Sequence, residues 1–351
     1  MTDAIEIRGL TWRPGGTFSL RELDLTVPPG AIYGFLGPNG SGKTSTIRLL
    51  LGMARPQGGE MRVLGHPVPG ALPRILARTG YVPEKPHLYP SLTVDETLRV
   101  HGSFYPTWNP AWAREMREAF RLRPGARVGK LSKGETGKLM ILLALARKPD
   151  LLILDEPTDG LDPVVRREVL TALLDYVSRA GATVFISSHL VHELERFCDW
   201  VGVLDDGRMV AEMPMDAFKN EIKRLRIVRP PEPEAVQDLP FQVLGRHPSD
   251  GMAAGEIWIV RGWENVMADV LAEAGGKVRE VVHLDLEEAF VELLRGARPG
   301  PGEPEAHPSP PLPSSSSGRE AKQGPAGAGT NGKRGAGGGS GGSPPARKGE
   351  G

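Results

Sequence analysis

Residues 37–44 read GPNGSGKT and match the pattern G-x-x-x-x-G-K-[ST] in full. An apolar run at residues 31–36 precedes the match, and residues 43–51 after it have the composition of a helix. A buried strand, a glycine-rich loop and a helix in this order are the context in which the pattern binds phosphate groups. The segment therefore predicts a nucleotide-binding loop inside an α/β fold.

The residue types of the loop have distinct expected tasks. Gly40 and Gly42 let the backbone turn so that its N–H groups point at phosphate oxygens, and the helix start adds the positive end of its dipole. The Lys43 ammonium would reach the β- and γ-phosphates, and the Thr44 hydroxyl would bind Mg²⁺. GTPases, kinases and transport ATPases all carry such a loop, so it does not by itself identify the class.

Composition restricts the partners and the cellular compartment that we expect for the chain. It has 351 residues, with 43 basic and 43 acidic side chains, so it lacks the basic field that nucleic-acid binding requires. Cys198 is the one cysteine, which excludes an intrachain disulfide and fits a reducing compartment. The first residues show no signal-peptide pattern, and the apolar run at residues 139–146 is too short to span a bilayer.

The order of apolar segments indicates the domain organisation. Strand-like segments at residues 5–8, 21–27 and 31–36 follow one another without helices, which predicts an antiparallel layer ahead of the α/β core. From there to about residue 223, short apolar strands alternate with amphipathic helices, as in a largely parallel sheet. Beyond a proline cluster at residues 229–233, two strand and two helix patterns predict a small α+β module.

Two further segments carry candidate catalytic groups. Residues 151–156 read LLILDE, an apolar strand that ends in two acids, where Asp155 would hold the Mg²⁺ shell and Glu156 would orient or deprotonate water. Residues 183–189 read TVFISSH, a strand with His189 just past its end, within reach of a γ-phosphate. Ahead of both, residues 131–135 read LSKGE at the start of a predicted helix, where free N–H groups favour an anion.

These motifs, in this order, resemble the nucleotide-binding subunit of an ABC transporter. The resemblance covers about residues 5–223 and implies a P-loop cassette with a parallel core, an antiparallel layer and a helical subdomain. We expect the cassette at residues 1–228, with its helical subdomain at about 85–148. The α+β module would follow at residues 229–296 and a disordered, Pro/Gly/Ser-rich tail at 297–351.

The resemblance also assigns roles. Glu156 matches the catalytic glutamate, His189 the switch histidine and Asp162 the D-loop aspartate, with Lys43 as a further catalytic group. Residues 131–135 match the signature sequence, which in this family reads the nucleotide of the opposite subunit; its members here are Leu131, Ser132, Lys133, Gly134 and Glu135. The implied ATP-binding residues are Gly37, Pro38, Asn39, Gly40, Ser41, Gly42, Lys43, Thr44 and, for the adenine ring, Trp12.

Cofactors and partners follow from the same resemblance. The implied cofactors are ATP and Mg²⁺, the latter held by Thr44, Asp155 and Glu84. Two cassettes would close head-to-tail on two ATP–Mg²⁺, with a homodimer as the simplest assembly. A membrane permease on another chain would be driven by the pair, and the chain would lie on the cytoplasmic face of the membrane. Exporter-type ATPases are the nearest subgroup, and no nucleic-acid partner is expected.

The sequence departs from the family pattern at a few positions. Glu84 stands where the family's Q-loop has glutamine, and Lys133 and Glu135 stand where glycine and glutamine are commonest in the signature. Glu84 would still meet Mg²⁺ or its water, but adds negative charge beside Asp155 and Glu156.

Other assignments stay open at this stage. Trp12 and Phe18 are both candidates for stacking on adenine, with Trp12 favoured, and Pro14 occupies the position that ungapped spacing gives. Tyr89 and Leu92 lie where the family receives the membrane subunit, although either could be a core residue. The C-terminal module could regulate, aid dimerisation or stabilise the cassette.

Two other classes of protein fit the sequence less well than a transport ATPase does. Soluble ABC-type proteins of translation usually carry two cassettes, those of DNA repair carry long coiled coils, and this chain shows neither pattern. A GTPase or P-loop kinase would leave residues 131–135 unexplained, and no Asn-Lys-x-Asp segment is present to read a guanine base.

Overall fold

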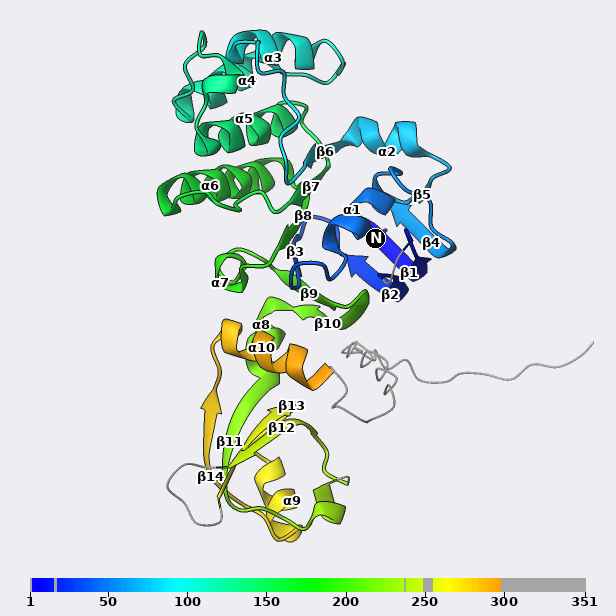
Figure 1. Ribbon diagram of the computed structural model, residues 1–351, viewed down its shortest axis with the longest axis vertical. Helices are drawn as coiled ribbons and strands as arrows, with labels where there is room; N and C mark the ends of the chain where they lie inside the picture. Colours follow the sequence, from blue (N-terminus) through cyan, green and yellow to red (C-terminus); the bar gives the residue numbers. More distant parts are fainter. Residues whose placement is uncertain (1, 16–17, 237, 249–254, 298–351) are drawn as a thin grey trace, which may run out of the picture. The chain divides into compact units, whose positions relative to one another are not determined.

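A computed structural model of the protein describes residues 2–15, 18–236, 238–248 and 255–297 (Figure 1). The tail expected at residues 297–351 therefore lies, apart from its first residue, outside the described part of the chain. Within the described residues, no helix combines the length and apolar character needed to cross a membrane.

A six-stranded sheet forms the centre of the cassette, in the order β10-β9-β3-β8-β7-β6. Five strands run parallel, and β10 pairs antiparallel with β9 at one edge. Their bounds are β3 Ile32–Leu36, β6 Thr79–Val82, β7 Leu151–Asp155, β8 Thr183–Ser188, β9 Trp200–Asp205 and β10 Arg208–Pro214. Every residue of β3, β7 and β8 is buried, as expected for strands covered on both faces.

Alternate residues of these strands enter two different hydrophobic cores. Tyr33 and Phe35 of β3 pack with α1 (Lys43–Leu50) and the antiparallel layer, whereas Ile32 and Leu36 pack on the side of α5 (Lys133–Leu145) and α6 (Pro163–Ala180). The two-residue period of a strand produces this division. The parallel sheet is therefore the wall between the cores, and its strand ends are held from both sides.

The antiparallel layer is a four-stranded sheet in the order β2-β1-β4-β5. Its strands are β1 Ile5–Trp12, β2 Leu20–Val27, β4 Gly58–Val63 and β5 His66–Val68, with α2 (Leu72–Arg78) leading from β5 to β6. The sequence grouped residues 31–36 with this layer, but β3 pairs in parallel with β8 and β9 instead. The grouping relied on the short connection between β2 and β3 in the sequence. Both faces of β3 are buried, however, and this burial fits the parallel sheet instead.

The helical subdomain lies between β6 and β7 and consists of α3 (Val94–Gly102), α4 (Pro110–Ala119) and α5, the helices at the top of Figure 1. Thr93 begins α3 with a capping box: its hydroxyl accepts from the Glu96 N–H, and the Glu96 carboxylate accepts from the Thr93 N–H. Asn109 caps α4 in a similar way, accepting from the Trp112 N–H. Local capping signals therefore fix the starts of the helices in this subdomain.

His101 lies in an aromatic cluster at the end of α3. Its ring centroid is 5.0 Å from that of Tyr105 and 5.7 Å from that of Trp108, and the Arg147 guanidinium stacks 3.6 Å above the Tyr105 ring. Burial, and then the charge of Arg147, lower the pKa of His101 from 6.5 to about 4. The folded protein therefore holds this histidine neutral at a pH where the unfolded chain would protonate it.

This depressed pKa makes stability depend on pH. His101 contributes stability that is fully present above pH 6.5 and is lost as the pH falls toward its folded pKa of about 4. Discounting for the partly exposed ring, we expect the wild type to lose about 2 kcal/mol more unfolding free energy than His101→Gln between pH 7 and 4.5. Urea unfolding at both pH values measures the difference; equal losses in the two proteins would contradict the assignment.

The C-terminal module has its own antiparallel sheet, in the order β12-β13-β11-β14. The strands are β11 Ile222–Arg229, β12 Gln242–Pro248, β13 Glu256–Arg261 and β14 Lys277–His283. One face packs with α9 (Met267–Glu273) around the fully buried Trp258. Because β11 pairs with β13 and β14, this sheet begins at Ile222, while the expected domain boundary at residues 228–229 stays a prediction.

Helix α10 (Leu286–Ala297) joins the module to the cassette. Leu286, Phe290 and Leu293 belong to the same buried core as residues of α7 (Val191–Leu194) and α8 (Met215–Glu221). Burial of each such apolar side chain contributes about 1.5–3 kcal/mol. Of the roles considered for this module, stabilisation of the cassette is therefore supported by the packing of α10.

Candidate functional site

The glycine-rich loop leaves the carboxyl end of β3 and enters α1. Gly40 and Gly42 have positive φ angles of 83° and 116°, and Gly42 is the N-cap of α1 in the left-handed region. A Cβ atom on Gly37 would collide with the Leu204 carbonyl oxygen of β9. The loop is thus formed by two glycines that supply its turns and one that permits close contact with the sheet.

Lys43 is the first residue of α1, and its side chain is buried beneath the glycine-rich loop. Its ammonium donates to the carbonyl oxygens of Gly37 at 2.7 Å and Pro38 at 3.2 Å. It also forms an ion pair with Glu156, with Nζ 3.2 Å from Oε1. The two side chains are only 6% and 11% exposed, so their charges interact with little screening by water.

Asp155 ends β7 beside the start of α1. Its Oδ1 atom accepts from the Thr44 hydroxyl at 3.2 Å and from the Ser187 hydroxyl at 2.8 Å. Burial raises the pKa of Asp155, while the bonds from Ser187 and Thr44 oppose the shift. A buried carboxylate next to a threonine hydroxyl offers the hard oxygen ligands that Mg²⁺ prefers.

The residues present fit a magnesium site of the kind that uses few protein ligands. Within the described ranges, no group of three or more His, Cys, Asp or Glu side chains is arranged to hold a metal. Mg²⁺ is usually bound through one or two protein groups together with substrate phosphates and water. Thr44 and Asp155 would hold it in this way, with the loop supplying the phosphate side.

Glu156 links the loop to His189 on the neighbouring strand end. Its Oε2 atom accepts from the His189 backbone N–H at 3.2 Å and lies 2.9 Å from the His189 ring Nδ1. Glu156 itself has φ 48°, an unusual left-handed conformation for a non-glycine residue, and its N–H donates to the Ser187 hydroxyl at 3.0 Å. Lysine, glutamate and histidine therefore form a continuous chain of contacts across three strand ends.

These groups line a cavity of about 580 Å³, a size within the range of small-molecule sites. It lies at the carboxyl ends of parallel strands, where α/β sheets bind ligands. The lining residues are Phe18, Asn39, Gly40, Gly42, Lys43, Thr44, Ser45, Glu84, Glu156, Asp159 and His189. Residues predicted from distant parts of the sequence thus meet in one place, including Glu84.

The aromatic residue favoured for adenine stacking does not line this cavity. Trp12 is on β1 and packs, partly buried, against the core that β1 shares with α1. Phe18, the other candidate, lines the cavity, and its ring lies within 2.8 Å of a Cβ atom placed on Gly42. Spacing in the sequence could not decide between Trp12 and Phe18, because the fold determines which of the two rings faces the phosphate-binding loop.

The signature sequence lies outside the cavity lining, at the start of α5. Ser132 is the N-cap, and its hydroxyl accepts from the Glu135 N–H at 3.1 Å. The Glu135 carboxylate accepts from the Ser132 N–H at 2.9 Å, and this bond is the largest cause that lowers the pKa of the carboxyl, while burial opposes the shift. Asp162, like Ser132, caps a helix: its carboxylate accepts from the N–H groups of Val164 and Val165 at the start of α6.

Sequence reasoning missed two residues of this region. Ser187 bonds both Asp155 and the Glu156 N–H, so it fixes the spacing of the two acids. Asp159 lines the cavity and forms an ion pair with Lys133 of the signature, with Nζ 3.2 Å from Oδ2. The sequence could have indicated Ser187, because it lies at the end of β8, the strand that pairs with β7. The contact between Asp159 and Lys133 could be identified only from the three-dimensional structure.

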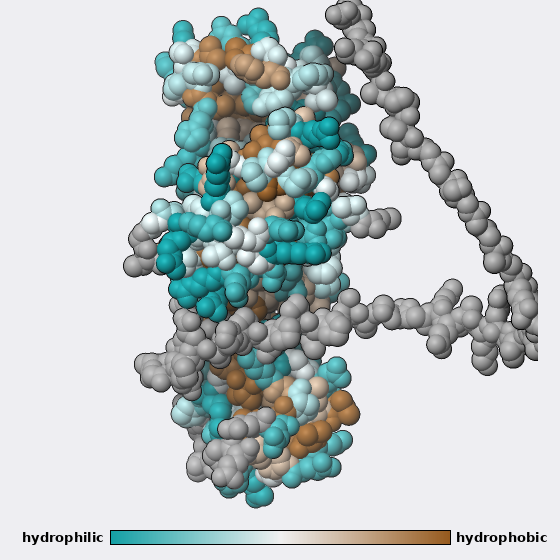
Figure 2. Space-filling model, turned by 90° about the vertical axis from the view of Figure 1, so that its right-hand side faces the viewer, coloured by the Kyte–Doolittle hydropathy of each residue, from teal (hydrophilic) through white to brown (hydrophobic). Residues whose placement is uncertain are grey.

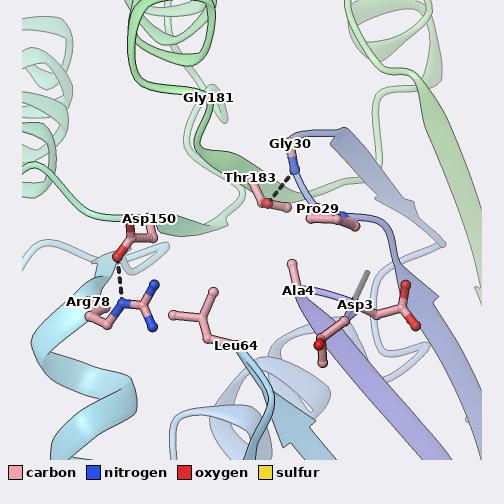
Figure 3. Close-up of a pocket in the computed structure, with 10 residues that line it drawn as sticks. Asp3, Ala4, Pro29, Gly30, Leu64, Arg78, Asp150, Gly181 and Thr183 are labelled. Carbon is pink, nitrogen blue, oxygen red and sulfur yellow. Dashed lines mark hydrogen bonds and ion pairs between the residues drawn. The ribbon is translucent and has the colours of Figure 1, made fainter.

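A second cavity, of about 250 Å³, lies at the opposite strand ends (Figure 3). Two interactions join residues of its lining: Arg78 Nε donates to Asp150 Oδ2 at 2.7 Å, and the Gly30 N–H donates to the Thr183 hydroxyl at 2.8 Å. Arg78 and Asp150 of this lining pair with each other and are half exposed, and no lysine, histidine or glutamate lines the cavity. The chemistry of the described residues is therefore concentrated at the first cavity.

Comparison with known proteins points to one family. The sequence profile of the family described as ABC transporter matches residues 20–159, and a second, for an AAA domain, matches residues 126–195. Nod factor export ATP-binding protein I of Cupriavidus pinatubonensis (strain JMP 134 / LMG 1197) is 38% identical over 228 residues, which cover 63% of this chain and 70% of that protein. Bacitracin transport ATP-binding protein BcrA of Bacillus licheniformis is 36% identical over 226 residues, covering 64% and 74%.

Solved structures show the same fold. The ATP-binding subunit of an ABC transporter superposes with a TM-score of 0.56 at 27% identity, covering 62% of this chain and 92% of that one. The dimeric bacterial ABC transporter cassette MJ0796 gives 0.54 at 23% identity, covering 60% and 98%. Fold and site define a P-loop ATPase. The chain belongs to the family of ABC transporter ATP-binding proteins, and its ATPase activity is coupled to transport.

Proposed function

We propose that the chain is the ATP-hydrolysing subunit of an exporter, and that two copies close head-to-tail on two ATP–Mg²⁺ to drive a separate membrane permease. The observation that carries this proposal is a separation of the expected ATP-binding residues: Lys43, Glu156 and His189 line one cavity, whereas Ser132 and Gly134 lie outside its lining. A second cassette would bring its signature to the open side. The work would take place on the cytoplasmic face of a membrane.

Within each site, the residues divide the work by their chemistry. Lys43 would exchange its carbonyl and Glu156 partners for the β- and γ-phosphates, while Thr44, Asp155 and Glu84 would hold Mg²⁺ or its water. Glu156, released from Lys43, would orient and deprotonate the attacking water, with His189 fixing its carboxylate. Phe18 is the residue that we assign to adenine, because it lines the cavity.

Export as the direction of transport is supported by the relatives, which are named for Nod factor export and bacitracin transport. The exposed apolar side chains support a membrane partner. Tyr89 and Phe104 are 69% and 72% exposed, and Val100 of α3 is also exposed. Figure 2 shows apolar side chains in the uppermost part of the molecule, where Figure 1 has α3 and α4. Exposed apolar side chains that gather in one patch mark interaction surfaces, and we assign that role to these residues.

Replacing Tyr89 and Phe104 together with serine tests the permease contact. We expect the variant to hydrolyse ATP as the parent does, but to lose a co-purifying multi-span membrane protein when both are expressed in the native host. Val164→Ser is the matched control, because Val164 of α6 is equally exposed, at 69%. Retention of the membrane protein by the double variant would contradict this docking surface, and absence of such a protein from the wild type would contradict the transport assembly.

A further inference from the structure

His189 is joined to the short buried helix α7. Only Leu190 separates it from the first residue of α7, and the Ser188 hydroxyl accepts from the Leu190 N–H at 2.9 Å. Val191 and Leu194 of α7 are buried, at 3% and 0% exposure. Because buried side chains are closely packed, the backbone of His189 has little freedom to move independently of α7.

Helix α7 packs closely on β3 of the central sheet. A Cβ atom on Gly34 of β3 would lie 3.1 Å from both the Leu194 Cδ1 atom and the Cys198 Sγ atom. The Cys198 N–H also donates to the Leu194 carbonyl oxygen at 3.0 Å, which extends the helical hydrogen bonding past the end of α7. The position of α7 therefore depends on all of the side chains that pack around it.

A second neighbour of α7 is α10, which belongs to the C-terminal module. Leu286, Ala289, Phe290 and Leu293 recur at helical spacing and are at most 7% exposed. These four residues share one buried core with both buried residues of α7. Helix α10 packs on α7 and α8, and also on β11 and β12 of the module's own sheet. It therefore connects that sheet to the segment that contains His189.

The contacts between His189 and Glu156 depend on the position of the His189 backbone. The His189 N–H donates to Glu156 Oε2 at 3.2 Å, and the ring Nδ1 lies 2.9 Å from the same oxygen. The first of these distances is at the long end of the range for an N–H···O hydrogen bond. A small shift of α7 would therefore weaken the contact and turn the ring away from the carboxylate.

We propose that Leu286 and Phe290 of α10 are positioning residues for ATP hydrolysis. Through α7 they hold His189 against Glu156, so that the C-terminal module sets the rate of hydrolysis. They leave the affinity for ATP unchanged, because α1 and its Lys43 follow the glycine-rich loop and α1 packs in the other hydrophobic core. This inference rests on the roles that the proposed function gives to Glu156 and His189.

The test compares two leucine-to-alanine substitutions in the full-length protein. Leu286→Ala removes volume from the core that α10 shares with α7, whereas Leu271→Ala makes the same change in the separate core around Trp258. Both leucines are buried, at 3% and 0% exposure, so both variants lose stability through a cavity. We expect Leu286→Ala to lower the turnover number at saturating ATP about tenfold, and Leu271→Ala to lower it less than about twofold.

Two further measurements separate positioning from a general loss of structure. The affinity for a fluorescent ATP analogue should be the same in Leu286→Ala as in the wild type. The NMR signals of the His189 ring, identified by their absence from His189→Ala, should shift in Leu286→Ala and stay in place in Leu271→Ala. Leu286→Val removes a single methylene group and should show the same pattern with about a threefold loss of turnover, which serves if the alanine variant does not fold.

Equal losses of turnover in Leu286→Ala and Leu271→Ala would overturn the inference, because loosening of the module would then explain both. Loss of ATP affinity in step with turnover would overturn it as well. Unchanged ring signals of His189 in the Leu286 variants would overturn this inference alone and leave the proposed function intact. Shifted signals without any loss of turnover would instead contradict the role of His189 in the proposed function, and the inference with it.

Discussion

Glu156→Gln should lower the turnover number for ATP hydrolysis by about 100- to 10,000-fold, the contribution of a positioned general base. Glutamine keeps the shape of the side chain and can still accept from the His189 N–H, but it cannot take a proton from water. Because the substitution also removes the ion pair with Lys43, the lysine is released for phosphate, and ATP should bind at least as tightly as in the wild type. Phosphate release and binding of a fluorescent ATP analogue measure the two effects.

The control for this prediction is Glu115→Gln, the same chemical change on the exposed surface of α4. It should leave both turnover and ATP affinity at their wild-type values. If Glu156→Gln retained more than a tenth of wild-type turnover, Glu156 would not be the base. If it lost ATP binding instead, the ion pair with Lys43 would have a supporting rather than a competing role.

The sequence was sufficient for the parts of the site that local patterns determine. The loop at residues 37–44 was recognisable because Gly40 and Gly42 occupy positions where positive φ angles are required. Asp155 and Glu156 were recognisable because a fully apolar strand predicts burial on both faces and a carboxyl end at the ligand edge. In each case, one short segment contains both the structural constraint and the chemical group.

The remaining features depend on contacts between segments that are far apart in the chain. The membership of β3 in the parallel sheet, and of β11 in the C-terminal sheet, follows from pairing partners, which periodicity does not identify. The choice of Phe18 over Trp12 at the cavity depends on the path of a loop. The pair of Lys133 with Asp159 joins residues 26 positions apart through the packing of α5 on α6.

Gly37→Ala should lower ATP affinity by about 100-fold, which corresponds to the upper contribution, about 3 kcal/mol, of a hydrogen bond to a charged group. The new methyl group would collide with the Leu204 carbonyl oxygen and lie 2.6 Å from the buried Ser41 hydroxyl. Leu204 belongs to β9, which is paired on both sides, with β10 and β3, so the loop itself must shift. The Gly37 carbonyl, which accepts from Lys43, would move with it and misplace the ammonium. Titration with a fluorescent ATP analogue measures the loss.

Gly40→Ala separates this steric effect from the general cost of altering the loop. A Cβ atom there meets nothing within 4 Å, although the φ of 83° is unfavourable for alanine by about 1–2 kcal/mol. We therefore expect a loss of ATP affinity of about tenfold, clearly smaller than for Gly37→Ala. If the two variants bound ATP equally, backbone conformation rather than contact with β9 would govern the loop. If Gly37→Ala bound ATP like the wild type, the loop would not be anchored on Leu204 at all.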